Sequence, residues 1–151
     1  MLFQTHILLG IVLFILTRNL FGGGNEIIFF LLVLLGAILP DIDSKNSKIN
    51  RWSGIIGIIA TFFAKHRGIF HSVLFHLALF FVLTPIIGVY YASGLFLGYL
   101  AHFIGDGVTK AGLAPLYPLS LYKIKGPLKV GSFFEGVILL LLFMWIALRF
   151  V

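Results

Sequence analysis

Long apolar runs alternate with short polar segments along most of this chain. Five runs carry almost no charge: 7–16, 27–39, 73–91, 95–104 and 137–151. A helix needs about 20 mainly apolar residues to cross the hydrocarbon core of a bilayer, and several runs reach that length once their flanks are included. The pattern therefore predicts an all-α, polytopic membrane helical bundle, built as a single integral membrane domain over residues 1–151.

Turn-forming residues divide this pattern into separate helices. A Gly-rich turn follows the first run at 22–25, Pro40 ends the second helix, and Pro85 is expected to kink the helix over 70–91. The first run lacks a basic start and a cleavage site, so we expect a retained helix rather than a signal peptide. The predicted crossing helices cover 2–20, 26–39, 70–91, 94–109 and 132–151.

One further apolar segment, 52–64, is too short to cross. Its roughly 13 residues would span about 20 Å as a helix, against a hydrocarbon core of about 30 Å. We expect a short re-entrant or interfacial helix here, in addition to about five transmembrane helices.

Composition supports a membrane location. The chain is 60% hydrophobic and 11% charged, and its mean hydropathy is +1.12. Soluble domains are usually about 45–50% apolar and about 25% charged. Cysteine is absent, which excludes disulfides and thiolate metal sites.

Basic residues are distributed unevenly between the two ends of the predicted helices. If segment 52–64 does not cross, nine of the eleven Lys and Arg residues share one side, and only Arg18 and Arg149 lie on the other. The positive-inside rule then makes the first side cytoplasmic, in a multi-pass protein of the cell (inner) membrane. The net charge of +6 indicates topology and contact with lipid headgroups rather than nucleic-acid binding.

Most acidic and histidine side chains fall near this same side, where ionisable groups often mark function. Asp41 and Asp43 follow Pro40, and in an extended turn alternate residues point the same way, so both could reach one cation. The alternative is that they are ordinary loop aspartates. His66 and His71 flank Arg67 at a helix entry; each imidazole is a ligand or an interfacial side chain. Arg67 holds an anionic substrate group or is a topology charge.

His102 and Asp106 are the strongest pair in the sequence. They lie four residues apart in an apolar helix, on one face and one turn apart. This spacing favours a shared metal, or a carboxylate that orients a metal-bound imidazole, over a simple interhelical hydrogen bond. His6 lies at a matching depth and is a weaker ligand candidate. We expect His76 to have a packing role and Glu135 to favour the dipole at a helix start, although a role of Glu135 in the site stays open.

The order of these motifs resembles a known family, the YdjM-like, LexA-regulated, membrane-bound metal-dependent hydrolases. The resemblance rests on Thr5-His6, Leu39-Pro40-Asp41-Ile42-Asp43-Ser44, His66-Arg67-Gly68, His71-Ser72, and Gly98-Tyr99 with His102 and Asp106. It implies a small helical membrane protein with His and Asp metal ligands. By motif match the polar positions are His6, Asp41, Asp43, His66, His71, His102 and Asp106.

These residues lead to a functional hypothesis: metal-dependent hydrolysis at the cytoplasmic membrane face. Six or seven ligands exceed one tetrahedral site and indicate two divalent ions, zinc, manganese or magnesium, about 3.5–4 Å apart. Asp106 or Asp43 is the candidate general base. The basic surroundings suggest a membrane lipid or other phosphoester as the substrate, and no feature indicates an oligomeric state. The alternatives are a metal-ion or proton transporter and a non-catalytic protein whose metal holds its helices together.

Overall fold

The computed structural model describes residues 1–63 and 67–149, and this part of the chain is helical. The helices are α1 (Phe3–Thr17), α2 (Glu26–Ile38), α3 (Lys48–Trp52), α4 (Ile55–Phe63), α5 (Val73–Ile87), α6 (Val89–Gly107) and α7 (Phe133–Ala147), with 3₁₀ turns η1 (Arg18–Leu20), η2 (Leu39–Asp43) and η3 (Ile69–His71). The described residues contain no strand, only isolated bridges between Thr109 and Leu128 and between Leu113 and Ile124. The all-α prediction is confirmed.

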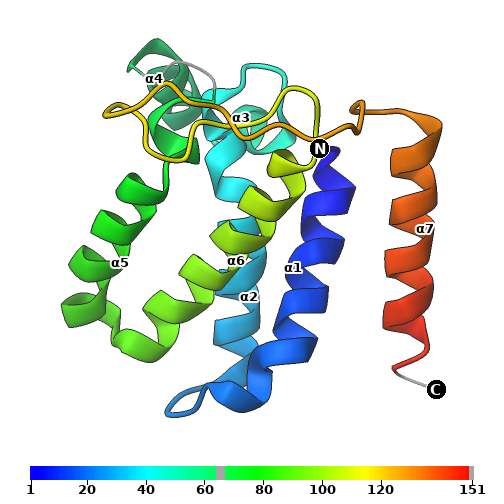
Figure 1. Ribbon diagram of the computed structural model, residues 1–151. Helices are drawn as coiled ribbons and strands as arrows, with labels where there is room; N and C mark the ends of the chain where they lie inside the picture. The colour runs from blue at the N-terminus through cyan, green and yellow to red at the C-terminus, as the bar shows by residue number, and fades with distance from the viewer. Residues whose placement is uncertain (64–66, 150–151) are drawn as a thin grey trace.

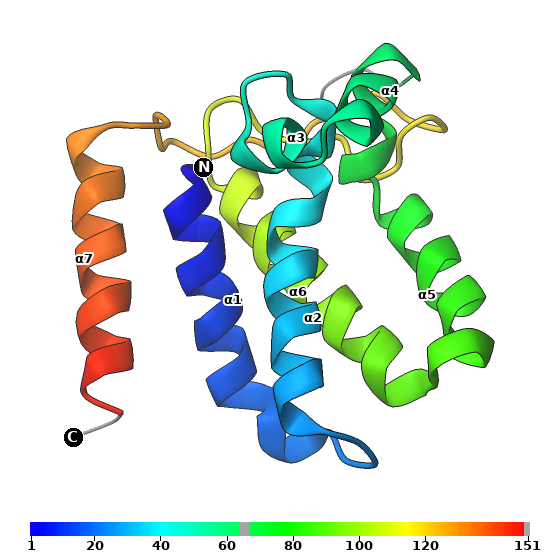
Figure 2. The same ribbon diagram turned by 180° about the vertical axis from the view of Figure 1, so that it is seen from behind.

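The long helices run alternately in opposite directions, and the short elements cover one end of the bundle. Figures 1 and 2 show α1, α2, α5, α6 and α7 in this arrangement. The N-terminus, α3, α4 and the segment 108–131 all lie at the same end, which we call the capped end. The predicted short helix is present there as α4, but α3 was not predicted.

Helices α2 and α6 form the centre of the bundle because glycines let their backbones approach closely. A Cβ atom at Gly36 would overlap the carbonyl of Leu95, and one at Gly98 would overlap the carbonyl of Val33. Small residues serve the same purpose in membrane helix pairs generally. Beside this contact, Phe14, Phe29, Val33 and Leu97 form a buried apolar cluster.

The reversal between α5 and α6 differs from the prediction. We expected helices over 70–91 and 94–109, but the chain turns at Gly88, which has φ +85° and ψ 152°. Glycine adopts a positive φ without the steric cost of a Cβ. Pro85 lies inside α5, three residues before the turn, and α5 ends at Ile87, so the predicted helix end at 91 is wrong.

Helix length does not confirm five membrane crossings. Among the described residues one helical run, Phe3–Leu20, is long and apolar enough to cross a bilayer; α5 and α7 are apolar but shorter. Each has 15 residues, which corresponds to about 22 Å. Large apolar side chains are nevertheless exposed on all the long helices, among them Leu16, Leu31, Phe81, Ile104 and Phe143.

The segment that follows α6 folds back across the capped end. Leu113 and Ile124 exchange backbone hydrogen bonds of 3.0 and 2.9 Å, and Leu128 N donates to Val108 O at 3.1 Å. Val73 N at the start of α5 donates to Pro115 O at 2.8 Å. These bonds hold the segment over the ends of α5 and α6, where the candidate site lies.

Candidate metal centre

Five of the predicted ligands meet at the capped end from four different elements. His6 comes from α1, Asp41 from η2, His71 from η3, and His102 and Asp106 from α6. They form two groups, His6–Asp41–His102 and His71–His102–Asp106, and within each group the candidate ligand atoms lie within 4.8 Å of one another. All are buried except Asp41, whose side chain is 19% exposed. His102 belongs to both groups.

The pair on α6 has the geometry that its spacing predicts. His102 Nε2 lies 3.9 Å from Asp106 Oδ2. On the other side of the ring, His102 Nδ1 donates to the carbonyl oxygen of Ala37 on α2 at 2.9 Å. This bond fixes the tautomer, so the lone pair of Nε2 points into the cluster, as in many metal-binding histidines.

His6 stacks directly on His102. The two ring centroids are 3.9 Å apart and the planes are inclined by 10°, and His6 Nε2 lies 3.5 Å from Asp106 Oδ1. Gly105 makes room for this contact, since a Cβ there would lie 3.0 Å from the His6 ring. The Met1 amine also contacts Asp106 Oδ1.

His71 is held between two aspartates on opposite sides of its ring. Asp43 Oδ2 lies 3.3 Å from Nδ1, whereas Nε2 faces Asp41 Oδ1 at 3.9 Å and Asp106 Oδ2 at 3.8 Å. The expectation that Asp41 and Asp43 point the same way is therefore wrong. They lie in the 3₁₀ turn η2, where residues two apart project in different directions because a turn takes about three residues. Asp43 belongs to neither ligand group and is placed to orient His71.

Arg67 contacts two aspartates of the site and one backbone carbonyl outside it. Its backbone has φ +60°, in the left-handed region, and its N–H donates to Asp43 Oδ2 at 3.1 Å. The guanidinium lies 3.1 Å from Asp106 Oδ2 and donates to Gly112 O at 2.8 Å. Arg67 thus binds the carboxylates of both Asp43 and Asp106, and its side chain is 15% exposed. The prediction for His66 falls on a residue outside the described part of the chain.

The donor atoms of the cluster suit a divalent metal. His6 Nδ1 and His102 Nε2 are buried and have no hydrogen-bond partner among the described residues. Unpaired buried polar atoms are costly, and a metal would satisfy them. Imidazole and carboxylate together suit zinc or manganese, whereas magnesium prefers oxygen ligands and is the poorest match.

Glu135 and His76 lie outside both groups. Glu135 Oε1 accepts bonds from Leu2 N at 2.7 Å and Thr5 Oγ1 at 3.2 Å, and Oε2 accepts one from Gly131 N at 2.6 Å. These bonds link the start of α7 to the start of α1. Glu135 thus has a structural role in addition to the predicted interaction with the helix dipole.

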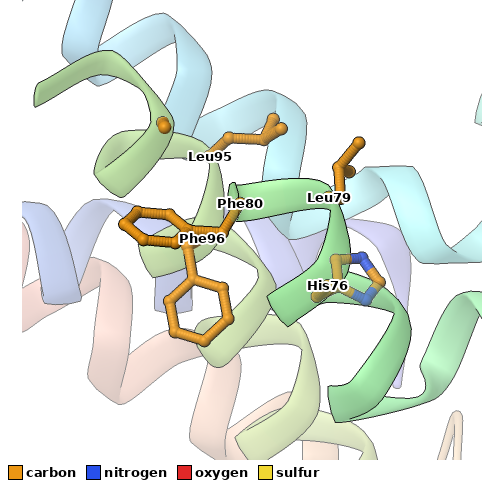
Figure 3. A pocket seen from close by; sticks show the side chains of 6 residues that line it. His76, Leu79, Phe80, Leu95 and Phe96 are labelled. Atoms are coloured by element: carbon orange, nitrogen blue, oxygen red, sulfur yellow. The ribbon is translucent and has the colours of Figure 1, made fainter. Parts of the chain in front are cut away.

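His76 has the packing role that we expected. Its ring stacks on Tyr99, with centroids 3.5 Å apart, and its Nδ1 donates to Ser72 O at 3.1 Å. Figure 3 shows His76 on the wall of a small apolar cavity with Leu79, Phe80, Leu95 and Phe96. Among the described residues, no other ionisable side chain lines this cavity.

The sequence did not single out Asn50, which supports the site by holding η2. Its Nδ2 donates to Ile42 O at 2.6 Å and to Gly57 O at 2.7 Å, and the residue is buried. It ties η2 to α4. Asn50 stands in a polar, basic stretch with no motif of its own, so nothing in the sequence distinguished it from a solvated loop residue.

We expect Asn50→Ala to lower the thermal stability of the detergent-solubilised protein. The change leaves two buried carbonyl groups without their donor, which costs about 1–3 kcal/mol. Thermal unfolding followed by circular dichroism measures the effect. The matched control is Asn46→Ala in the same segment, where the side chain is exposed. Equal melting temperatures for both variants would contradict the role given to Asn50.

Fold and site together define a helical protein that carries a buried cluster of histidines and aspartates at one end. The chain belongs to the YdjM inner membrane protein family, whose model matches residues 1–151. This confirms the family resemblance and supports the predicted location in the inner membrane.

Individual relatives agree with this membership. Protein YvsG of Bacillus subtilis (strain 168) is 36% identical over 108 residues, which cover 70% of this chain and 67% of the relative. The inner membrane protein YdjM of Escherichia coli (strain K12) is 35% identical over 122 residues, which cover 74% of this chain and 61% of that protein. The chain thus matches about three fifths of the length of the Escherichia coli relative. No solved structure matches significantly.

Proposed function

We propose that this protein is a membrane-embedded, metal-dependent hydrolase of phosphoesters. The observation that carries the proposal is the pair of ligand groups that share His102 and are buried except at Asp41. Such a set exceeds what one structural tetrahedral site needs. Bound divalent ions would supply Lewis acidity and an activated water, the chemistry that two-metal sites use on phosphoesters.

The residues of the chain have separate tasks in this proposal. His6, Asp41, His71, His102 and Asp106 hold the ions, while Asp43 orients His71 through Nδ1, at 3.3 Å. Asp41 is the most exposed carboxylate of the cluster, so it replaces Asp43 as the second candidate for the general base beside Asp106. Arg67 keeps Asp106 in place and offers guanidinium donors to an anionic phosphoryl group.

Charge distribution supports a site at the cytoplasmic membrane face. The segments across the capped end carry Lys45, Lys48, Arg51, Arg67, Lys110, Lys123, Lys125 and Lys129. Arg18 and Arg149 lie together at the opposite end, where they line one pocket. By the positive-inside rule the capped end faces the cytoplasm, with α1, α2, α5, α6 and α7 crossing the bilayer alternately. Local thinning of the bilayer and snorkelling of flanking residues accommodate helices as short as these.

The first test is the metal content of protein purified without chelator. We expect about two zinc or manganese ions per chain by mass spectrometry, and a loss of metal in Asp41→Ala because that residue completes one ligand group. His76→Ala is the matched control, since His76 is a buried histidine outside both groups. A wild-type protein that contains no metal after purification, and binds none when zinc or manganese is added, would contradict the proposal.

A transporter and a metal-stabilised structural protein give different results in the same preparation. A transporter moves zinc or manganese into vesicles and hydrolyses nothing. A purely structural metal predicts that Asp106→Asn unfolds the protein. The hydrolase predicts that Asp106→Asn stays folded by circular dichroism and loses the hydrolysis of phosphoester substrates.

A further inference from the structure

An apolar groove runs between α1 and α7. Helix α7 packs against α1 and against no other long helix to a comparable extent, and it stands at the edge of the bundle (Figures 1 and 2). The groove is lined by side chains from both helices, Val12, Leu16, Ile138, Leu141, Leu142 and Trp145. Among them are no carboxylates, and Arg149 lies at the far end.

At the capped end a basic pocket adjoins the groove. Ile138 lines both spaces, and the pocket adds Lys110, Lys129, Ser132 and Phe134. Both lysines are exposed, and the Oγ atom of Ser132 is buried with no hydrogen-bond partner among the described residues. The lining therefore changes from apolar along the helices to cationic where α7 begins.

The basic pocket lies beside the metal centre. Lys110 lies four residues after Asp106, just beyond the end of α6, and Thr109 between them donates to Asp106 O at 2.8 Å. From the other side, Glu135 near Ser132 bonds to Thr5, the neighbour of His6 in α1. The groove thus leads from the apolar flank of the bundle to the edge of the cluster, rather than to the opposite end.

We propose that this groove binds one phospholipid with an anionic headgroup, whose phosphate lies between Lys110 and Lys129 and whose acyl chain follows α1 and α7. Ammonium groups pair with phosphate oxygens, and the apolar wall suits a hydrocarbon chain. The lining of both spaces contains no carboxylate to pair with a choline or ethanolamine group, so an anionic headgroup is favoured. This inference rests on the proposed function in one respect: the bound lipid would be the substrate.

Photo-cross-linking tests the site without requiring turnover. The full chain is reconstituted in phosphatidylcholine vesicles that contain a phosphatidate with a photoreactive acyl chain. We expect labelling of Leu141, Leu142 and Trp145, and at least a fivefold reduction by unlabelled phosphatidate but not by added phosphatidylcholine. Lys110→Ala combined with Lys129→Ala should reduce labelling similarly. Lys123→Ala with Lys125→Ala is the control, since these exposed lysines belong to the same segment and do not line the pocket.

Two further variants distinguish the groove from lipid that merely surrounds the protein. Ile138→Trp fills the groove where its two parts meet and should abolish the labelling, whereas Leu140→Trp on the exposed side of α7 should not. Equal labelling of groove and exterior residues, without competition, would overturn the inference. So would the absence of lipid adducts on the groove residues in a protein that runs as a dimer in detergent, because a second copy would then occupy the groove.

The same experiments separate this inference from the proposed hydrolase. Labelling of the groove in a metal-loaded wild-type protein that hydrolyses no phosphoester supports the lipid site and contradicts only the enzyme. Hydrolysis of a water-soluble phosphodiester together with unchanged lipid labelling in the Lys110→Ala, Lys129→Ala variant supports the enzyme and overturns the lipid site.

Discussion

His102→Ala is expected to lose both metal ions and hydrolytic activity, because His102 is the one residue common to the two ligand groups. Loss of a residue that only supports a metal ligand typically costs about 10–100-fold in affinity or activity. Removal of a shared ligand should therefore exceed about 100-fold. Metal content by mass spectrometry and release of the alcohol from a soluble phosphodiester measure the two effects.

Single-group variants make this prediction sharper. His6→Ala and His71→Ala each affect one ligand group, so each should retain about one of the two ions while His102→Ala retains none. Circular dichroism must show that all three variants keep their helix content. If His102→Ala held as much metal as His6→Ala, the two groups would not share a ligand and the cluster would not be a single dinuclear centre.

The part of the site that lies on one regular helix could be predicted from the sequence. Residues four apart on an α-helix share a face, so the contact between His102 and Asp106 followed directly from their spacing. The short helix α4 followed from the length of its apolar run. In both cases the prediction depends only on residues within one helix and not on how other elements pack.

The remainder of the site depends on irregular backbone and on packing, which spacing does not encode. Asp41 and Asp43 separate because η2 is a 3₁₀ turn rather than an extended segment. Arg67 reaches Asp106 from a left-handed backbone conformation. The Ala37 carbonyl that orients His102 belongs to an apolar residue, so residue type alone could not reveal its role.

The close approach of α2 and α6 connects the fold to the chemistry of the site. Gly98 faces the backbone of Val33, and one turn further along each helix Ala37 O accepts the bond from His102 Nδ1. Any separation of the two helices would lengthen this bond and release the ring. The glycines of the interface therefore act on the metal centre indirectly, through the orientation of one imidazole.

We expect Gly98→Ala to destabilise the protein and to weaken metal binding at the same time. The new Cβ would overlap the Val33 carbonyl and approach the Ala37 nitrogen, both of which are backbone atoms that cannot rotate away. Overpacking of this kind costs about 1–3 kcal/mol, which outweighs the gain of about 1 kcal/mol from the helix propensity of alanine. Thermal unfolding in detergent and metal titration of the folded variant measure the two effects.

Gly136→Ala in α7 is the matched control, since it makes the same change in a helix where nothing lies within 4 Å of the new Cβ. Its melting temperature should equal or exceed that of the wild type, because only the propensity term acts. If Gly98→Ala behaved like Gly136→Ala, α2 and α6 would have to lie further apart than they do in this structure. If Gly98→Ala lost stability but bound metal with unchanged affinity, the hydrogen bond from His102 to Ala37 would not be what holds the imidazole in place.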